Sequence, residues 1–364
     1  MEVDRVGIIG IGMMGVAIAA AHLRVGLPVL LYDNSDVSLL NAAGRIEDEL
    51  RAQGLLYDSR LVESTNCLND MSGLRIIIET IPEKLRLKHR LFRELQQLSE
   101  TGTTPQTLIF SNTSTISISS LSEPFSTDLR LCFCGFHFFH PVRERSLIEI
   151  IAGSGTGAAT IEFAKIHAAR LGKRSIVVKD GVGFLVNRIL NAYLMSALNL
   201  LESGVMIERI ERVAVGFGMK MGPFRIMDEI GLDVVLHAGW VLSKAFPDRV
   251  LGSDVLVKLV ESRRLGRKTG RGFMIYDSQT QWQGDGVPDA EIAEIIVTKN
   301  SGNDIGNDIT DDQIIKNLFG NMREEALRCF ADGIISNLSD ADIASVQALG
   351  FPESKGGITQ LNLA

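Results

Sequence analysis

The first 180 residues alternate between short apolar runs and longer stretches in which apolar residues recur with helical spacing. Short apolar runs bounded by glycine or polar turns are typical of buried strands. The predicted strands cover residues 6–9, 28–32, 75–81, 107–110, 131–139, 147–151 and 175–178. The helix-like stretches between them cover residues 16–23, 35–66, 83–98 and 160–171. Strands that alternate with helices predict a Rossmann-like, doubly wound α/β sheet.

From about residue 182 the pattern is helical, with predicted helices over 187–202, 207–215 and 227–246. The basic, glycine-rich stretch 266–273 predicts a mobile loop or, alternatively, a loop that faces phosphate. A polar stretch rich in Gly, Asn and Asp then predicts a linker. We therefore predict four parts, which are a Rossmann domain (1–181), a helical substrate domain (182–280), a linker (281–309) and a second, shortened helical domain (310–364).

The C-terminal 55 residues weakly repeat the first helical region. A repeated helical unit could bury its apolar face against its twin, as two subunits do across a two-fold axis. We therefore expect either a homodimer or a monomer that contains a pseudo-dimer. The matching positions are Ala197, Leu198, Gly204, Gly216 and Phe217 in the first copy and Ala326, Leu327, Gly333, Gly350 and Phe351 in the second.

A glycine-rich turn follows the first predicted strand at once. Gly10 permits a tight turn, Gly12 lets the backbone approach a pyrophosphate, and Gly15 lets the next helix pack closely on the strand. The N-terminus of that helix offers free N–H groups to phosphate. Asp33, at the end of the second strand, is placed to accept both ribose hydroxyls and to repel a 2′-phosphate. This pattern predicts NAD rather than NADP, and a tight turn without a ligand is the alternative.

A histidine and a glutamate stand inside two neighbouring apolar runs. Pro141 and a charged stretch around Arg143 separate the runs, so the chain turns there. His137 and Glu149 are equidistant from Arg143, and a hairpin would place them opposite each other. A histidine held by a carboxylate is a general base with a fixed tautomer. The alternative is two unrelated core residues.

A polar cluster, residues 111–114, follows the predicted strand 107–110. Ligands of open α/β sheets bind at the carboxyl ends of the strands, so this cluster is a candidate binding segment. The same residue types also cap helices, which is the alternative interpretation.

Composition excludes several other functions. The net charge is -7 without a long basic run, which argues against nucleic acid as a partner. Four cysteines are too few for a disulfide framework, and Cys132 and Cys134 lack a second ligand pair, so we expect buried thiols and no metal. No apolar stretch reaches about 18 residues, and only five residues precede the first apolar run. We therefore expect no membrane span, no signal peptide and a cytoplasmic protein.

Taken together and in this order, the motifs resemble those of the L-3-hydroxyacyl-CoA dehydrogenase family. The closer resemblance is to the dehydrogenase half of the multifunctional fatty-acid β-oxidation protein, whose C-terminal domain is duplicated. The resemblance covers nearly the whole chain. It rests on the glycine turn with Asp33 and on residues 111–114, 135–139, 147–150, 183–188, 221–224 with Asp228, and 266–273.

The resemblance implies an NAD-dependent, reversible oxidation of 3-hydroxyacyl-CoA to 3-oxoacyl-CoA. His137 would be the catalytic base and Glu149 its orienting partner. Ser114 and Asn187 would hold the substrate oxygen and the acyl thioester. The implied NAD contacts are Gly10, Gly12, Met13, Met14, Gly15, Asp33, Ile81, Glu83, Lys88, Asn112, Ser114, His140 and Lys268.

The chain also departs from the family pattern. His140 stands where asparagine is usual, Val182 stands where proline is usual, and residues 47–49 are acidic where members that bind CoA carry basic or hydroxyl residues. The second helical domain looks cut short at Ala364. A dehydrogenase for 3-hydroxyacyl groups on a carrier protein is therefore an alternative. A non-catalytic NAD-binding protein is another. A third is the dehydrogenase class with a catalytic lysine, for which residues 187–188, Asn-Arg, offer no lysine.

Overall fold

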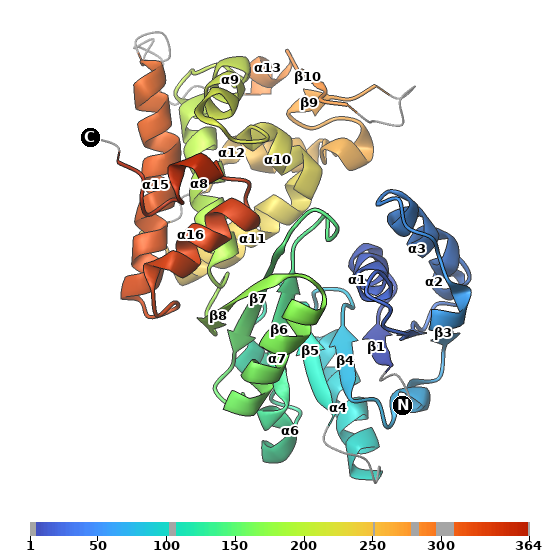
Figure 1. The fold of residues 1–364 in the computed structure, drawn as a ribbon. Helices are drawn as coiled ribbons and strands as arrows, with labels where there is room; N and C mark the ends of the chain where they lie inside the picture. The colour runs from blue at the N-terminus through green and yellow to red at the C-terminus, as the bar shows by residue number, and fades with distance from the viewer. Residues whose placement is uncertain (1–4, 102–106, 250–251, 278–283, 296–308, 363–364) are drawn as a thin grey trace. The chain divides into compact units, whose positions relative to one another are not determined.

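The computed structural model describes residues 5–101, 107–249, 252–277, 284–295 and 309–362. The chain divides into two compact units, Met1–Phe184 and Leu185–Ala364. The first unit is α/β and the second is helical (Figure 1). Across the described ranges, every helix is too short or too polar to cross a membrane.

One sheet of eight strands forms the centre of the first unit, in the order β3-β2-β1-β4-β5-β6-β7-β8. Neighbouring strands are parallel except for the antiparallel pair β6 and β7. This arrangement confirms the predicted Rossmann-like sheet. The strands are β1 (Val6–Ile9), β2 (Val29–Tyr32), β3 (Val62–Thr65), β4 (Ile76–Glu79), β5 (Leu108–Ser111), β6 (Phe133–Phe138), β7 (Leu147–Ala152) and β8 (Arg174–Lys179).

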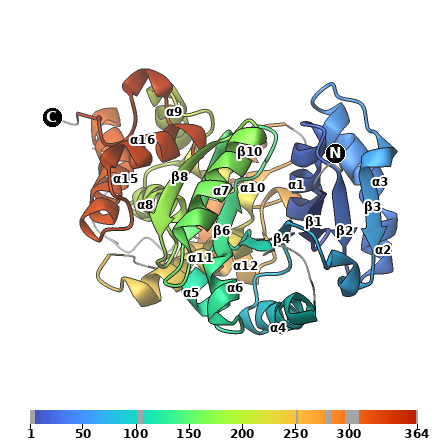
Figure 2. The ribbon, with the colours of Figure 1, turned by 60° about the horizontal axis from the view of Figure 1, so that its bottom comes forward.

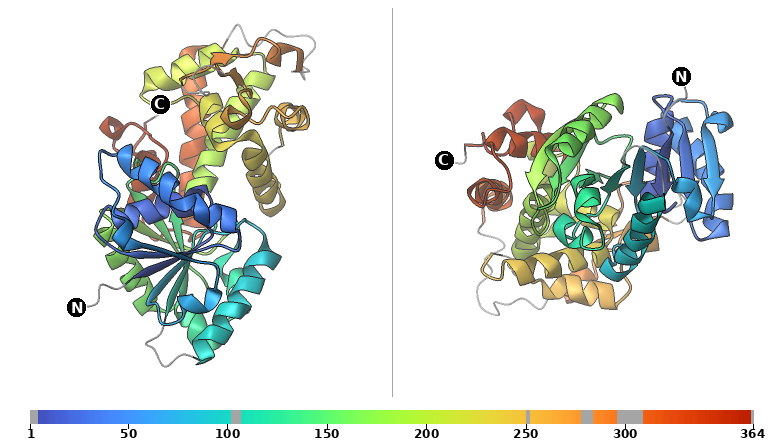
Figure 3. Two further views of the ribbon diagram at one scale, coloured as in Figure 1. Left: turned by 90° about the vertical axis from the view of Figure 1, so that its right-hand side faces the viewer. Right: turned by 90° about the horizontal axis from the view of Figure 1, so that it is seen from below.

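Helices cover both faces of this sheet (Figures 2 and 3). Crossovers between parallel strands are right-handed, so α1 and α3 lie on one face and α4 lies on the other. Helix α7 shares the face of α1, because His22 of α1 and His167 of α7 are in contact. The helices are α1 (Met13–Leu23), α2 (Asp36–Leu40), α3 (Ala42–Arg51), α4 (Leu85–Thr101), α5 (Ile118–Leu121), α6 (Thr127–Leu131) and α7 (Ala158–Arg170), with short 3-10 turns η1 (Ser59–Leu61) and η2 (Leu68–Met71).

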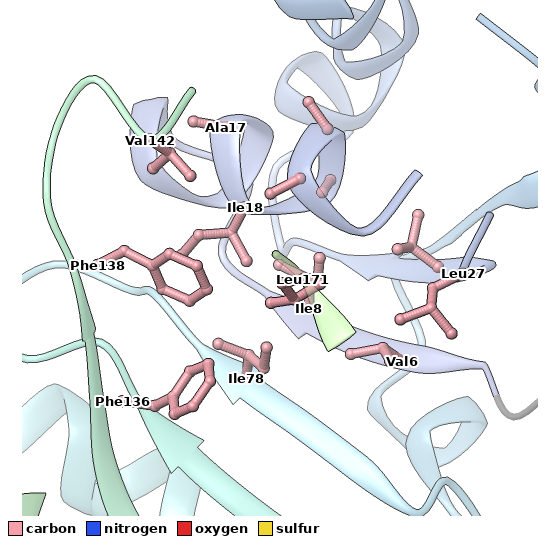
Figure 4. Close-up of a cluster of buried hydrophobic side chains, with 14 of the residues drawn as sticks. Val6, Ile8, Ala17, Ile18, Leu27, Ile78, Phe136, Phe138, Val142 and Leu171 are labelled. Carbon is pink, nitrogen blue, oxygen red and sulfur yellow. The ribbon is translucent and has the colours of Figure 1, made fainter. Parts of the chain in front are cut away.

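An apolar cluster fills the space between α1 and the sheet (Figure 4). Ile18 of α1 lies over the central strands, which contribute Ile8 and Ile78, and Phe136 and Phe138 of β6 close one side. All five side chains are buried. Burial of a side chain of this size contributes roughly 1.5–3 kcal/mol, so the cluster holds the strands whose ends carry the candidate site.

Two predictions about this unit were wrong in part. In the stretch 35–66, which was predicted to be helical, the last helix ends at Arg51. Residues 62–65 form the edge strand β3. The sequence of β3, Val-Glu-Ser-Thr, is too polar to stand out as a buried strand. The predicted strand 131–139 begins only at Phe133, because Leu131 ends α6, whose N-terminus is capped by Ser126. Cys132 is therefore the C-cap residue of α6 and does not lie in the same strand as Cys134.

Helices make up most of the second unit. The predicted helix 227–246 is in fact two helices, because Gly231 has a φ of 97°, which ends one helix and begins the next. The elements are α8 (Val186–Glu202), α9 (Ile207–Phe217), α10 (Pro223–Ile230), α11 (Leu232–Ala245), α12 (Asp254–Glu261), η3 (Arg267–Thr269), β9 (Met274–Ile275), β10 (Val287–Pro288), α13 (Ile292–Ile295), α15 (Asp311–Ala331), α16 (Leu338–Gln347) and η5 (Glu353–Lys355).

The two copies of the sequence repeat pack against each other inside this unit. Helices α8 and α15, which correspond in the repeat, lie side by side (Figure 1). The rings of Tyr193 and Phe319 stack between them, with centroids 5.6 Å apart. Each copy also packs a buried acid against a glycine. A Cβ on Gly222 would lie 2.3 Å from the Glu211 carboxylate, and one on Gly357 would lie 2.3 Å from Asp342. Whether the chain also forms a homodimer stays a prediction.

The predicted linker 281–309 is described only for residues 284–295. Within these residues β10 pairs with β9, and Asp289 accepts a hydrogen bond from Arg271 Nε at 2.7 Å. This part is therefore packed structure and not a free spacer. Residues 281–283 and 296–308 lie outside the described residues.

Candidate active site

His137 and Glu149 are direct partners in the antiparallel β6–β7 pair, as the predicted hairpin requires. His137 Nδ1 lies 3.0 Å from Glu149 Oε2, and both side chains are buried. A buried carboxylate needs a hydrogen-bond donor, so the imidazole keeps its proton on Nδ1 and leaves a lone pair on Nε2. The tautomer follows from this hydrogen-bond network. The pair has the geometry of an oriented general base.

Ser114 completes a chain of three side chains. It follows β5, and its Oγ lies 3.0 Å from His137 Nε2. Since Nε2 is the accepting nitrogen, the serine hydroxyl donates to it. The segment 111–114 therefore lies at the carboxyl end of β5 and beside the base, where ligands of open α/β sheets bind.

Glu83 holds the segment that carries Ser114. Its Oε1 accepts from Thr113 Oγ1 at 2.6 Å, from Ser114 N at 3.0 Å and from Thr115 N at 2.9 Å. Burial alone would raise the pKa of Glu83, but the charge of Lys88 and these hydrogen bonds outweigh burial and lower it. Glu83 is thus a charged anchor for the segment Thr113–Thr115, the serine loop.

Sequence reasoning missed Glu79, which lies at the end of β4 beneath this loop. Glu79 is fully buried and accepts from Lys88 Nζ at 2.6 Å and from Ser111 Oγ at 2.6 Å. The signal was present, because a carboxylate at the end of an apolar run needs a buried partner. Which cation supplies that partner was not readable from spacing. The Lys88 side chain is only 1% exposed.

The glycine turn fits a dinucleotide. Gly10 has a φ of 92°, and a Cβ on Gly15 would lie 2.0 Å from the Gly10 carbonyl oxygen, so both positions require glycine. A Cβ on Gly12 would meet no atom within 4 Å, which leaves open space in front of its backbone. Helix α1 begins next to it with no side-chain cap, so its N–H groups face that space. Met13 is exposed there and Met14 is half-buried.

Asp33 follows β2 and closes the same turn. Its Oδ2 accepts from Ile11 N at 2.7 Å, and its Oδ1 accepts from Ser35 N at 2.9 Å. A carboxylate offers about four acceptor positions, so this one can also accept from ribose hydroxyls. The negative charge of Asp33 suits NAD better than NADP.

Three further predicted contacts follow strands at this edge of the sheet. Asn112 Oδ1 accepts from Phe138 N at 2.8 Å and so ties the end of β5 to the end of β6. His140 follows β6 and is exposed. Ile81 follows β4, and its N–H donates to Glu79 Oε1 at 2.7 Å. The parallel strands β1, β2, β4, β5 and β6 all end at one edge, so these residues belong to the same edge as Ser114.

Two predicted site residues belong to the second unit. Asn187 lies in the first turn of α8. Lys268 lies in η3, and its ammonium pairs with Asp233. The glycine-rich stretch around it contains the 3-10 turn η3. Arg267 of this turn and the flanking Arg264 and Arg271 also pair with carboxylates. The meeting of Asn187 and Lys268 with the residues of the first unit stays a prediction.

A dinucleotide turn together with a histidine–carboxylate pair at the same sheet edge defines the class of NAD-dependent dehydrogenases. Comparison with known proteins specifies the class further. Residues 5–181 match the model of the 3-hydroxyacyl-CoA dehydrogenase NAD-binding domain, and residues 183–276 match that of the C-terminal domain. The chain belongs to the 3-hydroxyacyl-CoA dehydrogenase family. It is an oxidoreductase whose cofactor is NAD.

Similar proteins agree with this assignment. The fatty acid oxidation complex subunit alpha of Pseudomonas aeruginosa is 32% identical over 98% of the chain and 50% of its own length. The chain thus spans about half the length of the curated relatives it matches. The (S)-3-hydroxybutyryl-CoA dehydrogenase of Ralstonia eutropha is 32% identical over 76% of the chain and 100% of its own, with a TM-score of 0.68. The dehydrogenase part of multifunctional enzyme 1 from C. elegans is 26% identical over 97% of the chain and 79% of its own, with a TM-score of 0.66.

Proposed function

We propose that this chain catalyses the reversible, NAD-dependent oxidation of the 3-hydroxyl group of an L-3-hydroxyacyl thioester, as a step of fatty acid oxidation. The observation that supports it is the line Ser114–His137–Glu149, joined by two contacts of 3.0 Å at the edge that also carries the glycine turn. Relatives named for 3-hydroxybutyryl-CoA and for fatty acid oxidation support the substrate class.

In this proposal His137 Nε2 takes the proton of the substrate's 3-hydroxyl group. Glu149 stabilises the imidazolium that forms, and the buried position of the pair strengthens that interaction. NAD held by the glycine turn and Asp33 would supply the acceptor for the hydride of the 3-carbon. Ser114 orients the substrate oxygen toward Nε2, and Asn187 holds the thioester. General-base catalysis of this kind contributes about 10²–10⁴-fold, and orientation by the site contributes further.

The proposed cofactor contacts divide by chemistry. The backbone of Gly12, Met13 and Met14 receives the pyrophosphate, because N–H groups and open space meet there. Asp33 receives the adenine-side ribose. The contacts of Ile81, Asn112 and His140 stay predictions, as do those of Glu83 and Lys268. The contact of Lys88 stays a prediction as well, and its ammonium pairs with Glu79.

The substrate carrier separates the main proposal from its nearest alternative. Glu49 of the acidic stretch 47–49 pairs with Arg143 of the hairpin turn, so the protein's own arginine already balances part of that charge. The acyl group would reach the same base whether CoA or a carrier protein holds it, so the geometry at His137 does not distinguish the two carriers. Turnover of matched acyl groups on the two carriers does.

The test is a panel of L-3-hydroxyacyl thioesters, on CoA and on acyl carrier protein, read by NADH absorbance. We expect turnover of the CoA esters, and a loss of about 10²–10⁴-fold in His137→Gln with NAD binding intact. Near-normal turnover in His137→Gln would refute the assignment of the base. NAD binding without turnover of any thioester would favour a non-catalytic NAD-binding protein, and a strict preference for the carrier protein would favour a biosynthetic role.

A further inference from the structure

We propose that Phe184 is a positioning residue, whose ring packs against the imidazole of His137 and keeps water away from the hydrogen bond between His137 and Glu149. Phe184 is the last residue of the first compact unit, and its side chain is fully buried. The catalytic consequence of this packing rests on the proposed function, whereas the packing itself does not.

The backbone of Phe184 is left-handed, with a φ of 50°. For a bulky residue this conformation is a genuine outlier. The turn before it needs one left-handed residue, which Gly183 supplies with a φ of 74°. Phe184 N closes that turn by donating to the Gly181 carbonyl oxygen at 3.1 Å. Glycine would adopt the second left-handed conformation with less strain, so a phenylalanine in this place points to a need for its ring.

Hydrogen bonds around the turn hold the strained conformation in place. The N–H of Asp180 donates to the Ala152 carbonyl oxygen at 3.1 Å and so ties the start of the turn to the end of β7. The Asp180 carboxylate accepts from Ser117 Oγ at 2.7 Å, from Ile118 N at 2.9 Å and from Ser119 N at 2.8 Å. These three residues follow the serine loop. A strained conformation persists where its surroundings fix it from several sides, as they do here.

The turn places the Phe184 ring beside the proposed base. The ring centroids of Phe184 and His137 lie 6.2 Å apart, with their planes at 62°. A second ring, that of Phe139, lies 4.6 Å from the imidazole at 61°. These values are typical of edge-to-face contacts between aromatic rings. The imidazole thus has Glu149 at Nδ1, Ser114 at Nε2 and two phenyl rings beside it, and His137 is only 4% exposed.

Exclusion of water serves the proposed reaction. The attraction between an imidazolium and the Glu149 carboxylate weakens as the surroundings become more polar, so a water molecule beside the pair would reduce it. The ring contacts also restrict rotation of the imidazole, and a misplacement on the order of 1 Å at such a site costs about 10²-fold in rate. Phe139 is partly exposed, whereas Phe184 is fully buried. Loss of the Phe184 ring would therefore leave a cavity beside the imidazole.

The test compares three substitutions at residue 184 with one control. Phe184→Leu keeps an apolar side chain, Phe184→Ala removes the ring and keeps the strained backbone, and Phe184→Gly removes the ring and relieves the strain. Phe92→Leu is the control, because Phe92 is equally buried in the same unit and packs on Phe125 and Phe133. All four variants should melt below the parent chain through lost packing. The glycine variant should melt above the alanine variant, because glycine accepts the left-handed conformation.

Turnover should follow the ring and not the melting temperature. We expect kcat to fall by about 10²-fold in both Phe184→Ala and Phe184→Gly, although glycine restores part of the stability. Phe184→Leu should lose less, because its side chain fills part of the space. NAD affinity should stay near that of the parent chain in all of these variants. Phe92→Leu should keep the kcat of the parent chain.

The imidazole gives a readout that does not depend on turnover. In protein with isotope-labelled histidine nitrogens, the NMR signal of His137 is the one of six that His137→Gln removes. Its chemical shifts report the tautomer, and exchange of its Nδ1 proton with water reports access to the hydrogen bond with Glu149. We expect slow exchange in the parent chain and in Phe92→Leu. We expect faster exchange in Phe184→Ala and Phe184→Gly.

Two results would overturn the inference. Parent-like kcat and proton exchange in Phe184→Gly would show that the ring contributes packing alone. A lower kcat with unchanged exchange would place the ring at the substrate and not at the imidazole hydrogen bond. Turnover of His137→Gln separates either failure from that of the proposed function. Normal turnover there sinks the proposed function, whereas proton exchange still decides whether Phe184 shields the imidazole.

Discussion

His137 and Glu149 face each other across the β6–β7 pair, with Nδ1 and Oε2 3.0 Å apart. The pairing depends on the register of one hairpin. A slip of one residue would turn one of the two side chains to the opposite face of the sheet. The apolar neighbours Phe136 and Phe138, which enter the core on the other face, prevent such a slip. The core therefore holds the geometry of the proposed catalytic pair.

Glu149→Gln should lower turnover by about 10²–10⁴-fold, because the amide cannot stabilise an imidazolium as a carboxylate does. NAD affinity should stay near that of the parent chain, since Glu149 lies on β7 and the glycine turn follows β1. Steady-state kinetics and NAD titration measure the two quantities. Glu144→Gln, in the exposed part of the hairpin turn, is the control. Equal turnover in the two variants would contradict the role of Glu149.

Gly15→Ala should destabilise the first unit, whereas Gly12→Ala should not. The new Cβ at residue 15 would lie 2.0 Å from the Gly10 carbonyl oxygen, and overpacking of this kind costs about 1–3 kcal/mol. The Cβ at residue 12 would meet no protein atom within 4 Å, so its effect should fall on NAD affinity alone. Denaturant unfolding and NAD titration separate the two. A Gly12→Ala variant that binds NAD as the parent does would remove Gly12 from the cofactor site.

The first unit should lose stability in acid through His22 and His167, whose Nε2 atoms lie 3.0 Å apart in the core. Burial lowers the pKa of His22 to about 4, and burial with the nearby charges lowers the pKa of His167 to about 3. The unfolded chain binds protons near pH 6.5, so between pH 6.5 and 4 it binds more protons than the folded chain. Stability is thus complete above pH 6.5 and falls by about 1.4 kcal/mol per pH unit for each histidine as the pH drops.

Denaturant unfolding between pH 4 and 8 measures this slope, in the parent and in His22→Gln/His167→Gln. The glutamine pair does not titrate and should flatten the curve. His237→Gln changes an exposed histidine of α11 and should leave the curve unchanged. An equally steep curve in the double variant would assign the acid sensitivity to other groups.

The second unit should show the opposite pH dependence at Glu211. Burial raises the pKa of this carboxyl to about 7, although Phe224 N donates to it at 2.8 Å. The folded chain then binds more protons than the unfolded chain between pH 4.5 and 7, so the stabilising term is present below pH 4.5 and lost as the pH rises. Glu211→Gln keeps an acceptor for Phe224 and carries no charge.

We therefore expect Glu211→Gln to stabilise the second unit at pH 8 relative to the parent, with the difference shrinking as the pH falls to 4.5. Thermal or denaturant unfolding at the two pH values measures it. Glu208→Gln, exposed on the same helix, is the matched control. A variant less stable than the parent at pH 8 would mean that the ion pair with Arg225 outweighs the cost of burying the charge.

Much of the first unit could be predicted from local sequence pattern. Apolar runs located the strands, the positions of the glycines located the turn after β1, and symmetry about Arg143 paired His137 with Glu149. Each of these features depends on residues that are close along the chain, and its physical cause acts over the same short range. The wrong predictions also have local causes. The strand β3 is short and polar, and Gly231 interrupts a stretch whose pattern predicts one helix.

Which polar groups meet was decided by the tertiary structure. Ser114 contacts His137 from the loop after β5, and Lys88 pairs with Glu79 in the core. His22 of α1 contacts His167 of α7, which lies far along the chain. Apolar periodicity states that a segment is buried, but not which segment lies against it. The partner of a buried charge is chosen by packing between distant elements, because desolvation penalises every arrangement that leaves the charge unpaired.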